Sequence, residues 1–248
     1  MHRFFTAPEN ITDKKAILRG TDVAHIRTVL RLKSGDRVQI LDGCGNCYTV
    51  TLTRLECDGI ESRIDFKENM DNCESSLMIR LGQGMVKGTR FDGIVRRAVE
   101  LGVGQVVPVS ANRCVSKLST KNTIKKIERW QRIASEAAKQ CGRSRVPDIG
   151  FKPISVKEFC YANREADLRL IFWEEERSTR IRDLPYRNDL KSAAVLIGPE
   201  GGFSDSERAR LRGLDWSRPV ALGPRILRAD TAAVAAMTLW QKALGDWA

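Results

Sequence analysis

The chain has 248 residues, enough for one large or two moderate domains whose hydrophobic core needs no metal or disulfide to hold it. Its 42% hydrophobic and 29% charged residues are typical of a globular protein and exclude the fibrous and disordered classes. No hydrophobic run approaches the roughly 20 residues that span a bilayer, so we expect no membrane segment. The first residues show no export signal, and we therefore expect the seven cysteines to be reduced thiols in a cytoplasmic protein.

The net charge is strongly positive and unevenly distributed. Forty-two Lys and Arg residues against 31 Asp and Glu residues give +11, and residues 113–145 alone carry ten basic and two acidic side chains. Such a local excess attracts polyanions, so nucleic acid is the partner that we favour, ahead of a membrane surface. A solvated basic helix face is the alternative explanation. The ten basic residues are Arg113, Lys117, Lys121, Lys125, Lys126, Arg129, Arg132, Lys139, Arg143 and Arg145.

The first seventy residues have a predominantly β pattern. Residues 37–41 are predicted to form a strand, and hydrophobic and polar residues then alternate over 48–53 and 60–66. This alternation is typical of half-buried antiparallel strands in a small sheet or barrel. One helix is predicted over 21–31, with Thr21 as its N-cap. The polar segment 67–76 is the best candidate for a linker.

After residue 77 the pattern changes to hydrophobic strands that alternate with helices. This alternation favours βαβ units and a parallel sheet. The first helix is predicted from Thr89 to a stop at Gly102, the second over 120–141 and the last from about Thr231. In the second helix, Trp130 falls on the hydrophobic stripe, so we interpret it as a core residue and not as a platform for base stacking. The strands are expected at 77–81, 105–109, 170–173, 193–197 and 219–222.

The segment 193–207 carries the strongest functional signal. A buried strand ends at Ile197, the glycine-rich residues 198–202 follow, and Ser204 and Glu207 have the spacing of a capping box that opens a helix. In parallel sheets, ligands bind beyond the carboxyl ends of strands, and glycines there allow the backbone to approach a ligand. The segment matches neither a Walker A loop nor a Rossmann turn. A strand-to-helix turn without a ligand is the alternative.

A second strand-to-helix segment follows at 221–233. Its hydrophobic residues Leu222, Ile226 and Leu227 could form a wall for an adenine, while the backbone around Gly223 supplies hydrogen bonds. Arg228 stands two residues before Asp230 at the start of a helix, which is also the spacing of a purely structural ion pair.

These two segments, LIGPEGGFSDSE at 196–207 and LGPRILRADTA at 222–232, resemble the C-terminal half of the RsmE-type 16S rRNA (uracil-N3) methyltransferases of the SPOUT superfamily. One departure is Asp230, which stands where the family's signature has Glu. Further matching segments are RFF at 3–5, HIRTVLRLKSGD at 25–36, VKGTRFDGIVRRAVELGV at 86–103, NRCVSK at 112–117 and SEAAKQCGRSRVP at 135–147.

The resemblance implies a fold, a cofactor and a substrate. It implies a PUA-like β-barrel that binds RNA over residues 1–72, and an α/β SPOUT domain over 73–248 whose parallel sheet ends in a C-terminal trefoil knot. The family uses S-adenosyl-L-methionine without a metal and forms a homodimer. It methylates N3 of a uridine in the decoding region of 16S rRNA, uridine 1498 in that rRNA's usual numbering, on free rRNA or on the 30S subunit.

We expect three groups of site residues. The candidates for catalysis are Arg228, which would stabilise the developing uracil anion, and Glu200, which would accept the N3 proton. One of Glu174, Glu175 and Glu176 could reach the cofactor ribose. The cofactor pocket is expected from Ile197, Gly198, Gly202, Leu222, Gly223, Ile226, Leu227 and Arg228. Contacts to RNA are expected from Arg3, Arg27, Arg31, Arg113, Gln140, Arg143 and Arg145.

Two other interpretations belong to different classes. A non-catalytic RNA-binding or ribosome-assembly factor could keep the same fold, although both glycine loops are intact here. The pair Cys44 and Cys47 has the spacing of a zinc or redox motif, but no second pair exists, so we expect no metal.

Overall fold

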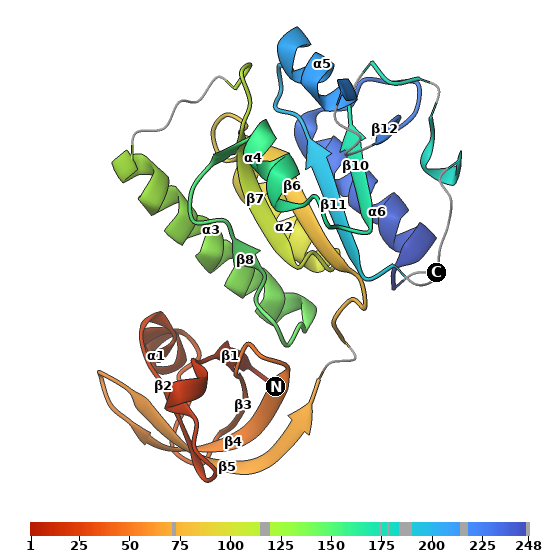
Figure 1. The fold of residues 1–248 in the computed structure, drawn as a ribbon. Coiled ribbons are helices and arrows are strands. Elements are labelled where there is room, and N and C mark those ends of the chain that lie inside the picture. Colours follow the sequence, from red (N-terminus) through yellow and green to blue (C-terminus); the bar gives the residue numbers. More distant parts are fainter. Residues whose placement is uncertain are drawn as a thin grey trace. The chain divides into compact units, whose positions relative to one another are not determined.

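A computed structural model describes residues 1–70, 73–114, 120–173, 175–177, 179–183, 190–213 and 218–246. The chain divides into two compact units (Figure 1). Unit one consists of residues 1–74 and 138–146, and unit two consists of residues 75–137 and 147–248. No helix in the described ranges is long and apolar enough to cross a membrane.

Unit one is built on a five-stranded sheet in the order β1-β3-β4-β5-β2. β1 and β3 pair in parallel, and the other neighbours are antiparallel. The inward residues of the alternating runs, such as Val50, Leu52 and Ile60, are fully buried, which confirms the predicted strands of this region. The strands are β1 (Arg3–Phe5), β2 (Lys15–Leu18), β3 (Arg37–Leu41), β4 (Asn46–Leu55) and β5 (Ile60–Asn69).

Three details of unit one correct the sequence prediction. The helix is shorter: α1 (Thr21–Ala24) passes into a π-helical turn at His25–Val29, and Gly20, not Thr21, occupies the N-cap position. Gly20 has φ 76°, so the chain enters the helix through a conformation that glycine tolerates and threonine does not. Phe66 is 60% exposed despite its place in the alternation, and β5 extends to Asn69, into the segment predicted as a linker.

Residues 138–146 join unit one through Glu74. The Glu74 carboxylate accepts from Nε and Nη2 of Arg143 at 3.1 and 2.6 Å and from the backbone N–H groups of Ser144 and Arg145, both at 2.9 Å. The side chains of Arg143 and Glu74 are only 7% and 11% exposed. A second pair, Lys139 with Asp22, also joins this segment to α1 at 3.0 Å. The segment is therefore held to unit one by partly buried charge pairs.

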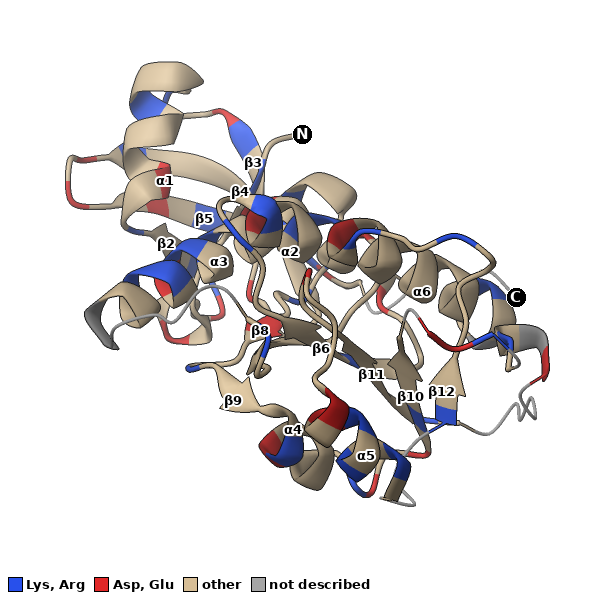
Figure 2. Ribbon diagram, turned by 90° about the horizontal axis from the view of Figure 1, so that it is seen from above, with Lys and Arg blue, Asp and Glu red and all other residues tan. Residues whose placement is uncertain are grey.

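Unit two contains a parallel sheet in the order β12-β10-β11-β6-β7-β8, with β9 paired to β7, as predicted for its α/β pattern. α2 (Arg90–Glu100) and α6 (Ala229–Leu244) cover one face, and α4 (Val156–Ala162) and α5 (Asp205–Gly213) cover the other (Figure 2). α3 (Thr120–Cys141) begins in unit two. The strands are β6 (Met78–Gly84), β7 (Gln105–Ser110), β8 (Asp148–Ile149), β9 (Ile154–Ser155), β10 (Leu168–Phe172), β11 (Ser192–Ile197) and β12 (Arg218–Val220).

The helices of unit two mostly follow the prediction. Trp130 is 2% exposed, packs on Phe91 with ring centroids 4.1 Å apart and donates to Asp92 at 2.9 Å, which confirms its place in the core. α6 begins at Ala229, two residues earlier than predicted, because Arg228 takes the extended N-cap conformation. α4 was not predicted from the sequence, although Ser155 and Glu158 form a capping box at its start.

The Glu74 carboxylate gives the first prediction. Glu74→Ala removes the carboxylate that neutralises the buried guanidinium of Arg143, and we expect a loss of about 3–5 kcal/mol in the free energy of unfolding. Glu56→Ala is the matched control, because it breaks an exposed pair with Arg54 in the same unit and should cost less than about 1 kcal/mol. Urea denaturation of the variants measures both. Equal losses would contradict a special role for Glu74.

Candidate active site

The carboxyl ends of four parallel strands lie side by side in unit two. Ile197 at the end of β11 is in register with Gln83 of β6 on one side and with Phe172 of β10 on the other. Phe172 is in turn in register with Val220 of β12. This strand order brings together four connections that are far apart in the sequence, and they enclose a cavity of about 650 Å³.

The cavity contains every residue that the sequence analysis placed in the cofactor pocket or in catalysis. Both glycine segments contribute, the first after β11 and the second after β12. The other lining residues come from the end of β10, from the connections after β6 and β10, and from the first turns of α2 and α6. The predicted residues that line it are Ile197, Gly198, Glu200, Gly202, Leu222, Gly223, Ile226, Leu227 and Arg228.

Two of the glycines hold backbone conformations that other residues rarely adopt. Gly202 has φ 64° and donates its N–H to the carbonyl of Pro199 at 2.9 Å, which closes the first loop into a tight turn. Gly223 has φ 111° at the start of the second loop. A side chain at either position would strain the backbone. Replacing Gly202 or Gly223 would therefore change the loop conformation whether or not a ligand contacts that glycine.

The first loop lies directly on the end of β6. A Cβ atom added to Gly84 would stand 2.6 Å from the carbonyl carbon of Gly198 and closer still to the nitrogen of Pro199. The buried amide of Gln83 donates to the Gly84 carbonyl at 3.1 Å and to the Gly198 carbonyl at 3.5 Å. The absence of a side chain at Gly84 therefore sets how closely the loop approaches the sheet.

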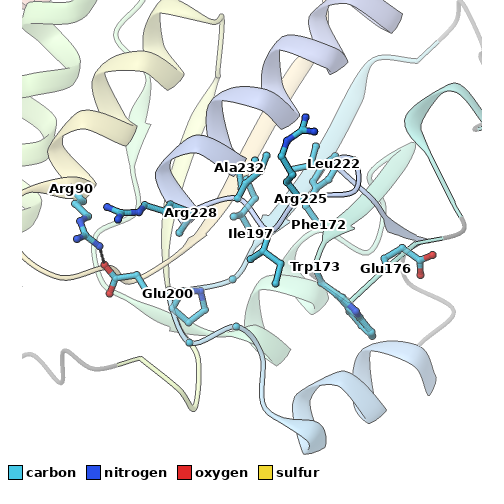
Figure 3. Close-up of a pocket in the computed structure, with 18 of the residues that line it drawn as sticks. Arg90, Phe172, Trp173, Glu176, Ile197, Glu200, Leu222, Arg225, Arg228 and Ala232 are labelled. Atoms are coloured by element: carbon cyan, nitrogen blue, oxygen red, sulfur yellow. Dashed lines mark hydrogen bonds and ion pairs between the residues drawn. The ribbon is translucent and has the colours of Figure 1, made fainter.

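One end of the cavity gathers charged side chains (Figure 3). Arg90 donates Nη1 to the carboxylate of Glu200, and the backbone N–H of Lys87 donates to the same carboxylate at 3.4 Å. The side chain of Arg228 extends toward this pair. Within the described ranges Arg228 forms no ion pair with Asp230, so the structural alternative for Arg228 is not realised.

The opposite end of the cavity is formed by the connection after β10. Glu176 lines the cavity and accepts from the backbone N–H groups of Arg177 and Thr179 at 3.0 and 3.1 Å. Its neighbour Glu175 pairs with Arg208 of α5, which holds this connection from outside the cavity. Of the three glutamates singled out in the sequence, Glu176 reaches the cavity, and Glu174 lies outside the described residues.

Comparison with known proteins identifies the family. A family model described as an RNA methyltransferase domain matches residues 73–241, and one described as an RNA methyltransferase PUA domain matches residues 18–65. Ribosomal RNA small subunit methyltransferase E of Buchnera aphidicola subsp. Schizaphis graminum is 31% identical, with 90% of this chain and 88% of that protein covered. This chain belongs to the ribosomal RNA small subunit methyltransferase E family. The methyltransferase E of Bacillus subtilis is 30% identical, with 89% and 87% covered.

Solved structures show the same fold over the whole chain. The methyltransferase E of Neisseria gonorrhoeae, bound to S-adenosyl methionine, has a TM-score of 0.85 and 32% identity, with 100% of each chain covered. A Legionella pneumophila chain whose structure holds the cofactor SAM has a TM-score of 0.89 and 31% identity, with 98% of each chain covered.

The residues predicted to contact RNA separate into the two units. Arg27 and Arg31 are exposed in unit one, where Arg27 donates to Cys57 Sγ at 2.9 Å and Arg31 has the left-handed φ of 54°. Arg3 is half-buried and donates to Gln39 at 2.9 Å, and Gln140 and Arg145 are exposed. Arg113 of unit two lies beside the glycine loop, where it donates to the Gly201 carbonyl at 3.5 Å.

The position of Arg143 differs from the prediction that this residue contacts RNA. Its guanidinium is buried and paired with Glu74, so we no longer propose it as a phosphate contact. The charge excess of residues 113–145 thus includes at least one arginine with a structural partner. Lys117 lies outside the described residues, as does the side chain of Lys121.

The two cysteines of the pair lie in different environments. Burial raises the pKa of the Cys47 thiol to about 11, so this thiol stays protonated at neutral pH, whereas Cys44 is exposed. Within the described part of the chain, no group of three or more His, Cys, Asp or Glu side chains is arranged to hold a metal ion.

Several residues of the cavity were not predicted from the sequence. Lys87, Arg90, Trp173, Arg177 and Arg225 all line it, and of these five only Arg225 stands in a glycine loop. Arg90 had one available signal, since it opens a predicted helix directly after a strand whose carboxyl end faces the site. Its partner Glu200 is 110 residues away in the sequence, and only the folded sheet brings the two together.

The close packing at Gly84 gives the second prediction. Gly84→Ala places a methyl group against the backbone of residues 198–199, and we expect a loss of about 1–3 kcal/mol with weaker hydrogen-exchange protection of the first loop. Gly93→Ala is the control, because the nearest atom to its added Cβ is Arg97 Nη1 at 3.5 Å in the middle of α2. That variant should gain up to about 1 kcal/mol. Unchanged exchange in Gly84→Ala would contradict the tight packing.

Proposed function

We propose that this chain transfers a methyl group from S-adenosyl-L-methionine to N3 of a uridine in 16S rRNA. The observation that carries the proposal is the single cavity that unites both glycine loops and the charged residues around Glu200. The methyltransferase E of Neisseria gonorrhoeae, 32% identical over the full chain, binds S-adenosyl methionine. The uridine of the decoding region that the sequence resemblance implies is the target that we favour.

The residues of the cavity fit this cofactor. Its volume of about 650 Å³ lies in the usual range for small-molecule sites. Ile197, Leu222 and Leu227 supply an apolar surface for the adenine, and the backbone of the second loop supplies hydrogen-bonding groups beside it. The Glu176 carboxylate suits the ribose hydroxyls. When bound, the cofactor supplies an electrophilic methyl group on a sulfonium, chemistry that needs no metal.

The charged end of the cavity fits the uracil. Neutral uracil carries a proton on N3, and its removal leaves a negative charge shared with the flanking carbonyl oxygens. Glu200 would accept that proton, and the guanidinium of Arg228 would stabilise the charge. N3 lies on the pairing edge of the base, so the target uridine must be unpaired or flipped out of its stack.

The larger organisation follows from the family. We assign residues 1–72 to a PUA-like barrel that docks RNA and residues 73–248 to the methyltransferase domain. We further propose that the chain around the second glycine loop is threaded as a trefoil knot and that the protein works as a homodimer in the cytoplasm on 16S rRNA, free or in the 30S subunit. The knotted arrangement rests on the family resemblance alone.

Cofactor binding is tested by filling the cavity from a helix. Ala232 lines the cavity on α6, and Ala232→Leu should weaken binding of S-adenosyl-L-methionine about tenfold or more while the helix keeps its propensity. Ala235→Leu, on the same helix but outside the lining, is the control. Isothermal calorimetry measures both affinities. A folded wild-type protein without detectable binding would support the non-catalytic alternative.

The product test is mass mapping of rRNA. In 16S rRNA from cells that lack this protein, a uridine should lose one methyl group, and the purified enzyme with S-adenosyl-L-methionine should restore it. A methyl group that persists in those cells would contradict the proposed substrate.

RNA docking is tested by salt dependence. Each phosphate contact contributes about 0.7–0.9 to the slope of log affinity against log salt. Arg27→Ala with Arg31→Ala should therefore flatten the slope by about one to two units and leave cofactor affinity unchanged. Arg37→Ala with Arg54→Ala removes the same charge from exposed arginines of the same unit that pair with Asp65 and Glu56, and should change the slope less. Equal slopes for the two double variants would contradict specific docking by Arg27 and Arg31.

A further inference from the structure

The ion pair between Arg90 and Glu200 points to a residue of the reaction outside the glycine loops. Arg90 is the first residue of α2 and lines the cavity. Its side chain is 47% exposed and that of Glu200 is 24% exposed, so both are accessible to a base that enters from solvent. Figure 3 shows the pair at the same end of the cavity as Arg228.

We propose that Arg90 is a catalytic residue of uridine methylation that exchanges Glu200 for a carbonyl oxygen of the target uracil. This inference rests on the proposed function. Before RNA binds, Arg90 holds the Glu200 carboxylate. When the uracil enters, the guanidinium contacts the oxygen on which negative charge develops, and Glu200 is released to take the N3 proton.

The charges at this end of the cavity favour an anion. Arg90 and Arg228 contribute two positive charges there, against the one negative charge of Glu200. Arg228 forms no ion pair within the described ranges, and the carboxylate of Glu200 already accepts from two donors. Proton transfer from N3 to Glu200 moves the one negative charge from the carboxylate to the uracil, where the guanidinium groups of Arg90 and Arg228 can stabilise it.

The proton step balances with the groups present. The N3–H bond breaks, its electron pair stays on N3 and is shared with O2 and O4, and the proton moves to a Glu200 carboxylate oxygen. With the cofactor bound, N3 would form a bond to the methyl carbon as the sulfur–methyl bond breaks, and the electron pair of that bond would stay on the sulfur, which becomes a neutral thioether. An arginine is suited to exchanging the Glu200 carboxylate for a uracil oxygen. Its planar guanidinium carries several N–H donors, so one donor can bind the new acceptor before another releases the old one.

A contact between Arg90 and an RNA phosphate would be a different role with a different signature. A phosphate contact changes affinity and its salt dependence, whereas stabilisation of the uracil anion changes the rate of the chemical step. The two roles also differ in their response to the acidity of N3–H. Fluorine at C5 of uracil makes this proton more acidic, so a 5-fluorouridine substrate needs less help from the enzyme.

The experiment measures single-turnover methylation with RNA that contains uridine or 5-fluorouridine at the target. For Arg90→Gln we expect a loss of about 100-fold in rate on uridine, the size typical of removing one oxyanion donor. The loss should shrink on 5-fluorouridine and as the pH rises, and Arg90→Lys should retain part of the rate. Cofactor affinity, measured by calorimetry, should stay the same and shows that the variants are folded.

Two further variants sharpen the test. Arg96→Gln removes an exposed arginine on the same helix, outside the cavity, and should leave the rate unchanged. Glu200→Gln should also lose rate, and its combination with Arg90→Gln should cost less than the product of the two single losses, because the pair acts together.

Three results would overturn the inference. These are a full rate in Arg90→Gln, a loss that is equally large on 5-fluorouridine, and a salt slope flattened by about one unit with no change in the chemical step. A wild-type enzyme that binds the cofactor but methylates no uridine would instead contradict the proposed function itself.

Discussion

The close approach of the first glycine loop to the end of β6 is the constraint on which the site depends. Gly84 leaves room for the backbone of residues 198–199, and the Gln83 amide fixes the same contact with hydrogen bonds to both segments. Because β11 lies between β6 and β10 in the sheet, this contact also sets the distance of the loop from the connection after β10. A wider separation at Gly84 would move the first loop, which lines the cavity, away from the end of β6.

The parallel arrangement of the strands makes the middle of the cavity apolar and its two ends polar. Its middle is formed by the ends of central strands, which are buried on both faces and therefore apolar, as Phe172 and Ile197 are. Its two ends are formed by the connections that carry Glu200 and Glu176. A ligand with an apolar centre and polar ends fits this division, and the reactive charge is expected at the end that also carries Arg90 and Arg228.

The sequence predicted those features that depend on local pattern. Alternation located β4 and β5, the glycine segments located the cavity, and helical spacing placed Trp130 in the core. It failed where a residue's role depends on a distant partner. Arg143 belongs to a basic run that suggested RNA, but Glu74, 69 residues away, turns it into a buried ion pair. Arg90 gained its role in the same way, through Glu200.

Asp230, which stands where the family resemblance leads us to expect Glu, lies at the start of α6. It is the second residue of α6, where a carboxylate favourably faces the positive end of the helix dipole whatever the length of its side chain. Within the described ranges it forms no ion pair with Arg228, which occupies the N-cap in an extended conformation. The acidic residue therefore stabilises the start of the helix through its position. The guanidinium of Arg228 stays available to the cavity because no carboxylate of α6 holds it.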